Sequence, residues 1–119
     1  MAERLRYGRA NRHRGEIEAL IDGERRVLCL TLGALAELET AFAADDLTAL
    51  AERFTSGRMK AVDMIRVIGA GLRGAGNVFS DEDVAAATME GGIAGHAAIV
   101  ADLLRATFGG LKGETPPDP

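Results

Sequence analysis

The chain has no tryptophan, a single cysteine and three prolines, and only 4% of its residues are aromatic. Because it stands alone, Cys29 cannot form an internal disulfide, and its position in an expected strand indicates an inert, buried thiol. No stretch approaches the ~20 consecutive apolar residues of a membrane-spanning helix. The arginine-rich N-terminus contains no apolar segment of the kind found in secretory signals. These absences favour a cytoplasmic protein without disulfides or a membrane span.

What the chain does contain suits one small domain. Hydrophobic residues make up 47% of 119 residues, many of them alanine, which is enough for a single modest core. Small apolar residues favour closely packed helices over a broad sheet sandwich. We expect a basic, disordered leader over residues 1–14, one α+β domain over residues 15–110, and a disordered, proline-rich tail over residues 111–119.

Charge is unevenly distributed along the chain. Residues 1–14 contain five arginines and one glutamate, whereas the whole chain carries a net charge of −4. The acidic remainder is a poor electrostatic match for a phosphate backbone, so no nucleic-acid partner is expected. The arginines are better explained as a solvated leader.

The strongest local signal is a β-hairpin centred on Asp22-Gly23, which lies between two short alternating runs. A two-residue primed turn needs positive φ, which glycine adopts without steric cost. A two-residue loop would pair Ile17 with Leu28, whereas a three-residue loop would pair Ile17 with Cys29. We prefer the first register, because it places Leu28 on the same face as Ile17.

Helical spacing begins after Thr31, whose hydroxyl suits an N-cap. Asp45 or Asp46 can cap a second helix, and Ser80 with Asp83 resembles a capping box. Helices are expected near residues 32–43, 47–56, 61–73, 81–89 and 93–108. The fold class is therefore α+β: an N-terminal two-stranded antiparallel β-hairpin followed by four to five α-helices packed in a small bundle.

The apolar positions of these elements define an expected core. Its members are Ile17, Leu28, Leu30, Leu35, Leu38, Phe42, Leu50, Phe54, Ile65, Ile68, Leu72, Val100, Leu104 and Phe108.

One motif could indicate cofactor chemistry: Gly69, Gly71 and Gly74 match the dinucleotide-binding pattern G-x-G-x-x-G. That motif works only where the glycines open a helix towards pyrophosphate. Here an acidic segment follows, only 43 residues remain after Gly76, and the preceding residues fit a helix as well as a strand. The glycines are better explained as ending a helix and allowing close packing.

The remaining polar residues do not form a recognisable catalytic site. His13 and His96 have no partner at metal-ligand spacing, and the carboxylates of residues 81–83 suit helix capping. Glu37 and Glu39 suit the solvated face of a helix. We therefore assign no catalytic, cofactor-binding or metal-binding residues and no cofactor, and the partner-binding residues are not identifiable.

The chain from Ala10 to Phe108 resembles small proteins from the tail-gene clusters of gene transfer agents and related tailed phages or prophages. The resemblance is carried by ANRHRGEIEALIDG, LTLGALAELETAF, LAERFTSGR, GLRGAG and GGIAGHAAIVADLLRATFG. The most specific part is LTLGALAELE after the Asp-Gly hairpin. Two features depart from the pattern: the first nine residues have no counterpart, and Lys60 stands where a capping serine or threonine is expected.

This family is described as tail tube-associated proteins or tail assembly chaperones. The resemblance therefore implies a non-enzymatic tail assembly protein of a gene transfer agent that binds the tape-measure or tail tube protein and can oligomerise. It would act in the host cytoplasm or become incorporated in the tail. Two alternatives stay open: a permanent structural tail tube component, or a small dinucleotide-binding or enzymatic domain that uses Gly69–Gly74.

Overall fold

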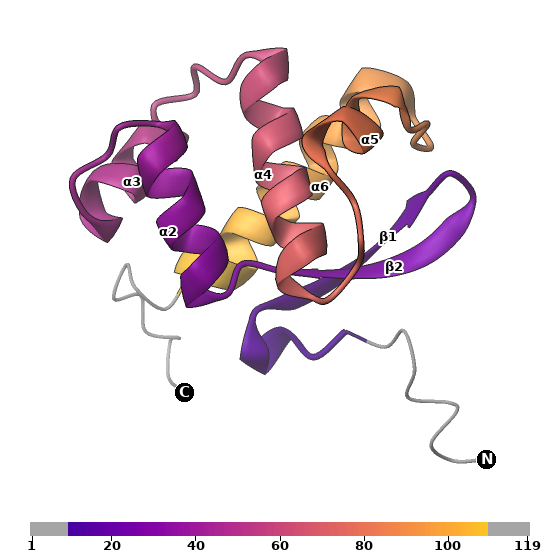
Figure 1. The fold of residues 1–119 in the computed structure, drawn as a ribbon, viewed down its shortest axis with the longest axis horizontal. Helices are drawn as coiled ribbons and strands as arrows, with labels where there is room; N and C mark the ends of the chain where they lie inside the picture. The colour runs from indigo at the N-terminus through magenta and orange to yellow at the C-terminus, as the bar shows by residue number, and fades with distance from the viewer. Residues whose placement is uncertain (1–9, 110–119) are drawn as a thin grey trace, which may run out of the picture.

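A β-hairpin opens the fold and helices cover it, in a computed structural model that describes residues 10–109 (Figure 1). The elements in chain order are η1 (Arg12–Arg14), β1 (Glu16–Ile21), β2 (Glu24–Cys29), α2 (Leu32–Ala41), α3 (Leu47–Thr55), α4 (Ala61–Gly74), α5 (Asp81–Ala86) and α6 (Gly92–Phe108). The predicted α+β class is confirmed, with five α-helices after the hairpin. Residues 1–9 and 110–119 lie outside the described residues, and with them the tail and most of the leader that were expected to be disordered over residues 111–119 and 1–14. Residues 10–14 of the expected leader are described and contain η1.

The hairpin turn has the predicted two-residue loop. Asp22 and Gly23 have φ values of 56° and 79°, as a primed turn requires. Ile17 pairs with Leu28, which confirms the preferred register, and both side chains are fully buried.

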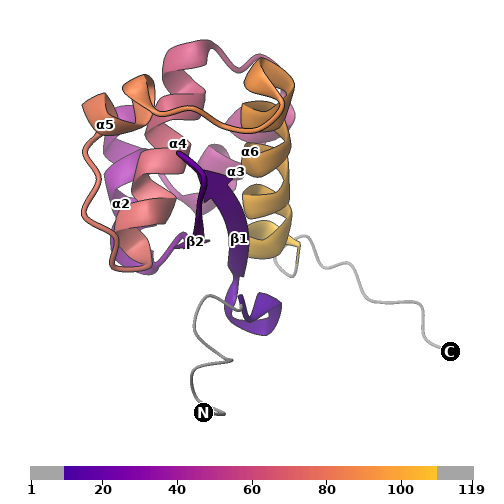
Figure 2. The ribbon, with the colours of Figure 1, turned by 90° about the vertical axis from the view of Figure 1, so that its right-hand side faces the viewer.

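Helix α4 lies at the centre of the fold. It packs against β2, α2, α5 and α6, while α6 also packs against β1. Figure 2 shows β1 beside α6 and β2 beside α4, so each strand of the hairpin has its own helix. None of the helices in residues 10–109 is long and apolar enough to cross a membrane.

Helices α2 and α3 each begin at a residue whose side chain caps the first turn. Thr31 Oγ1 accepts from the Ala34 N–H at 3.1 Å, and Asp46, rather than Asp45, caps α3 by accepting from the Ala49 N–H at 2.8 Å. These side chains satisfy donors that the first helical turn leaves free.

Two of the three remaining helices, α4 and α5, begin with a carboxylate at the third helical position. Ser80 and Asp83 form a reciprocal capping box with distances of 2.9 and 3.0 Å. At α4, the Lys60 N–H donates to the buried Asp63 carboxylate at 2.9 Å. Asp63 thus partly compensates for the missing serine or threonine at position 60.

Helix α5 ends at Ala86, three residues before the predicted end. Met89 instead forms an antiparallel bridge with Ile21, and both the N–H and the hydroxyl of Thr88 donate to Asp22 Oδ1. Contacts with the hairpin tip therefore take the place of the last helical turn that was expected for α5.

Most of the predicted core is confirmed. The buried members are Ile17, Leu28, Leu30, Leu35, Leu38, Leu50, Phe54, Ile68, Leu72, Val100 and Phe108. Phe42, Ile65 and Leu104 are only partly buried, so their placement in the core was wrong.

The prediction also missed Val67 and Leu103, which are fully buried. In α4 the buried side runs through Val67, Ile68 and Leu72 rather than through Ile65, because β2, α2 and α6 surround its C-terminal half.

Candidate partner-binding groove

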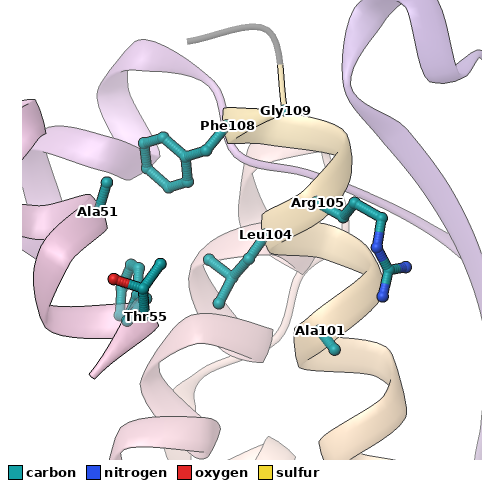
Figure 3. A pocket seen from close by; sticks show the side chains of 8 residues that line it. Ala51, Thr55, Ala101, Leu104, Arg105, Phe108 and Gly109 are labelled. Carbon is teal, nitrogen blue, oxygen red and sulfur yellow. The ribbon is translucent and has the colours of Figure 1, made fainter. Parts of the chain in front are cut away.

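An apolar groove of about 350 Å³ lies between α3 and the C-terminal half of α6 (Figure 3). Its lining residues are Ala51, Phe54, Thr55, Ala101, Leu104, Arg105, Phe108 and Gly109. In Figure 3, Leu104 and Phe108 point towards α3, whereas Arg105 extends away along the outer side of α6. Apolar side chains therefore form the walls of the groove, and its rim is open to solvent.

Two of the four phenylalanines of the chain line this groove, and a third, Phe42, packs against one of them. The Phe54 ring packs edge-on against Phe42, with centroids 5.5 Å apart, and lies 6.3 Å from the Phe108 ring. Edge-to-face pairs of this kind add to the stabilisation from burial alone. The aromatic cluster therefore connects α2, α3 and α6 beside the groove.

The two walls arise from the amphipathic pattern of each helix. In α3, Leu50 and Phe54 are buried four residues apart, which leaves the small Ala51 beside them on the groove side. In α6, Val100 and Leu103 face the core, which turns Leu104 towards the groove. Because Ala51 is small and Leu104 is only partly buried, the side chains of α3 and α6 do not fill the space between the two helices.

The groove offers little polar chemistry. The Thr55 hydroxyl donates to the Glu52 carbonyl at 3.1 Å, and Arg105 Nη1 lies 3.4 Å from Asp102 Oδ1. The eight lining residues include no carboxylate, histidine or cysteine. Such a lining suits the burial of an apolar segment.

The glycine motif lies inside α4 and opens no phosphate-binding turn. A Cβ at Gly74 would collide with the Cys29 carbonyl oxygen, and one at Gly71 would lie 2.7 Å from Leu103 Cδ2. Gly69 likewise faces Asp81 closely. These glycines allow β2, α6 and α5 to approach α4, and the dinucleotide interpretation lacks the required helix N-terminus.

The histidines and carboxylates considered from the sequence occupy separate places. His13 lies in η1, while His96 Nδ1 lies 2.7 Å from the Gly92 carbonyl oxygen in α6. Glu37 and Asp81 both pair with Arg73, at 3.0 and 3.1 Å, and so connect α2 and α5 to α4. No group of three metal-ligating side chains gathers within residues 10–109.

Cys29 is half-buried at the end of β2, rather than fully buried as expected. Its thiol donates to the Arg14 carbonyl at 3.6 Å. Burial, and then the nearby Glu16 carboxylate, raise the pKa of the Cys29 thiol. The side chain is therefore kept in its unreactive protonated form at neutral pH.

The groove itself was missed by the sequence analysis. Ala51, Ala101 and Arg105 carry no local signal of binding, because the groove depends on how α3 and α6 diverge. Composition offered only a general indication of such a surface, because the chain is rich in alanine and has few aromatic residues.

Comparison with known protein families gives a match over most of the chain. A family model described as "Phage tail tube protein, GTA-gp10" matches residues 14–110. No curated protein and no solved structure matches the chain.

Proposed function

Because the chain belongs to the phage tail tube protein family GTA-gp10, with a structural role in a phage-like tail, we propose that it acts there as an assembly chaperone. In this proposal it binds the tape-measure chain, or else the tail tube protein, in the cytoplasm of the host cell. The family is one of structural proteins, so the function requires recognition rather than catalysis.

The observation that carries the proposal is the groove between α3 and α6. Its volume of about 350 Å³ admits a few side chains of one segment, not the face of a whole subunit. Permanent subunit interfaces commonly bury more than about 2,000 Å² and are broadly apolar. A small apolar groove is better suited to holding a segment reversibly during assembly.

The expected occupant is an amphipathic helix of the partner. Two diverging helices with apolar facing sides can accept a third helix through side chains spaced three and four residues apart. Arg105 at the rim would favour an acidic residue flanking that apolar stripe.

The test is co-purification of the tagged full-length chain with neighbouring tail proteins, comparing Thr55→Lys with Thr40→Lys. Both threonines are exposed in the last turn of a helix, where a cation is tolerated, but only Thr55 lines the groove. We expect Thr55→Lys to weaken capture of the partner by about tenfold or more, which corresponds to about 1.4 kcal/mol.

The control Thr40→Lys should bind as the wild type does. Wild-type binding should also survive high salt, because apolar burial is not screened as exposed charge pairs are. Equal binding by both variants, or loss of binding at high salt, would contradict the groove as the recognition site.

A second candidate function is favoured by the description of the family itself. A tail tube protein is a permanent component of the particle, and the chain would then remain in the tail. The composition of purified particles distinguishes this role from that of a chaperone.

A further inference from the structure

A second groove, separate from that between α3 and α6, follows the outer edge of β1. Its volume is about 320 Å³, and it is lined by residues 17–20 of β1 together with Gly95, Ala98 and Ile99 of α6. Its floor is therefore a helix surface of small and aliphatic side chains beside the edge of a sheet.

This strand edge has backbone groups available for pairing. Ile21 and Glu24 form the hydrogen-bonded pair that closes the two-residue loop. Hydrogen-bonded and non-hydrogen-bonded pairs alternate from there along β1, so the N–H groups of Glu18 and Leu20 point away from β2. The Glu16 N–H, two residues earlier, donates outwards to the Asn11 carbonyl at 3.1 Å, which agrees with this alternation. Within residues 10–109, no hydrogen bond engages the N–H groups of Glu18 and Leu20 on this side.

The other edge of the hairpin is covered. The Val27 carbonyl accepts from Asn77 Nδ2 at 2.8 Å, and the Cys29 carbonyl lies against Gly74. Strand edges left open are sites where an extended segment can add. In the described residues, β1 thus presents the more accessible edge.

The open part of the edge is short and closed at both ends. Asn11 occupies one end through Glu16, and the Met89 segment occupies the other through its bridge to Ile21. A second copy of the chain would bring the same two flanking segments into collision with the first. A separate strand of about four residues meets no such obstacle, since each strand residue spans about 3.3 Å.

The side chains around the groove define what that strand should contain. Three carboxylates line the groove, those of Glu18, Glu90 and Asp102, and no cationic side chain does. Arg12 pairs with Asp102 at 2.7 Å and Arg25 Nε lies 3.7 Å from Glu18 Oε1, so among the described side chains the three carboxylates and two arginines leave one net negative charge. Successive residues of an added strand would point alternately towards the apolar α6 floor and towards solvent beside Glu18.

We infer that the outer edge of β1 binds an extended segment of another protein in which apolar and basic residues alternate. The added strand would accept hydrogen bonds from the N–H groups of Glu18 and Leu20, place its apolar side chains over Ala98 and Ile99, and place its basic side chains near the carboxylates that line the groove. The sheet would then have three strands.

The test uses a fluorescent, acetylated peptide of alternating valine and lysine, six residues long, with a valine–glutamate peptide as its counterpart. Fluorescence anisotropy measures its affinity for the full chain and for two proline variants. Leu20→Pro removes a donor on the outer edge of β1, whereas Arg25→Pro removes the matching donor on the edge of β2, in the same cross-strand pair.

We expect the valine–lysine peptide to bind, and Leu20→Pro to weaken that binding about tenfold or more. Arg25→Pro should not weaken it, because this variant removes no donor from β1 and releases Glu18 from its ion pair with Arg25. Bound peptide should also slow hydrogen exchange at the amides of Glu18 and Leu20. Equal affinity of both variants, or preference for the valine–glutamate peptide, would overturn the inference.

Two further outcomes are informative. If the Glu18 and Leu20 amides are already protected in the free full-length chain, another part of the chain or a second copy occupies the edge, and the inference is wrong. Thr55→Lys should leave peptide affinity unchanged, so failure at the α3–α6 groove and failure at this edge are distinguishable.

Discussion

At the scale of single residues, Gly74 marks a close approach between α4 and β2. A methyl group there would collide with the Cys29 carbonyl oxygen, which belongs to the backbone of β2 and has little freedom to move. Glycine therefore fits this position near the end of α4 despite its unfavourable helix propensity. The same residue that suggested a cofactor motif in the sequence is explained by packing.

We predict that Gly74→Ala destabilises the protein by about 1–3 kcal/mol, because the added methyl forces strand and helix apart. Gly33→Ala in α2 is the matched control: its new Cβ would meet only Thr31 Oγ1, at an ordinary 3.9 Å. This control should be neutral or stabilise by up to about 1 kcal/mol. Urea unfolding monitored by circular dichroism measures both, and a stabilising Gly74→Ala would contradict the close approach of α4 to β2.

The raised pKa of the Cys29 thiol leads to a prediction about pH. The folded state holds this proton more tightly than the unfolded chain, whose thiol has a pKa of about 8.5. The stabilising contribution is therefore complete below that value and is lost as pH rises through the folded pKa.

Iodoacetamide labelling followed by mass spectrometry should show this difference. Folded protein should react more slowly at pH 8 than protein in urea, and its labelling midpoint should lie at higher pH. A folded midpoint at or below that of the unfolded chain would show that Cys29 is more exposed than the structure indicates.

At the scale of elements, α3 is attached to the rest of the fold chiefly by aromatic and aliphatic packing. Leu50 and Phe54 are its buried residues, and Phe54 lies between the rings of Phe42 and Phe108. Phe42, expected in the core, is only partly buried, because it follows the last turn of α2. The stability of α3 should thus depend more on Phe54 than on Phe42.

We predict that Phe54→Ala costs about 3–5 kcal/mol, whereas Phe42→Ala costs distinctly less. The reason is the difference in burial, since the smaller side chain leaves a true cavity only at Phe54. Chemical unfolding of the two variants gives the comparison. A larger loss for Phe42→Ala would mean that the aromatic cluster is centred on α2 instead.

At the scale of the whole molecule, the fold combines a small core with two grooves on different faces of α6. One lies between α6 and α3, and the other lies between α6 and β1. The first is lined mostly by apolar side chains, and the second combines apolar side chains with three carboxylates. Membership of a structural tail family and this pair of grooves both point to recognition of other chains.

The proposed chaperone role predicts the composition of the particle. Purified phage-like particles should contain the tape-measure and tube proteins but not this chain, because a chaperone leaves once assembly is complete. Quantitative mass spectrometry of particles against the producing cells provides the measurement. Stoichiometric recovery of the chain in the particle would instead establish the permanent tail tube role.

The sequence by itself determined the local structure, because the forces that set it act within a few residues. Positive φ at Asp22-Gly23, the Thr31 cap and the Ser80–Asp83 box each need only their neighbours, and they placed the hairpin and helix starts correctly. Tertiary structure decided the rest: the end of α5 at the hairpin tip, the buried side of α4, the role of Gly74 and the existence of both grooves. These depend on contacts between segments distant in the chain, whose angles and spacings no local pattern encodes.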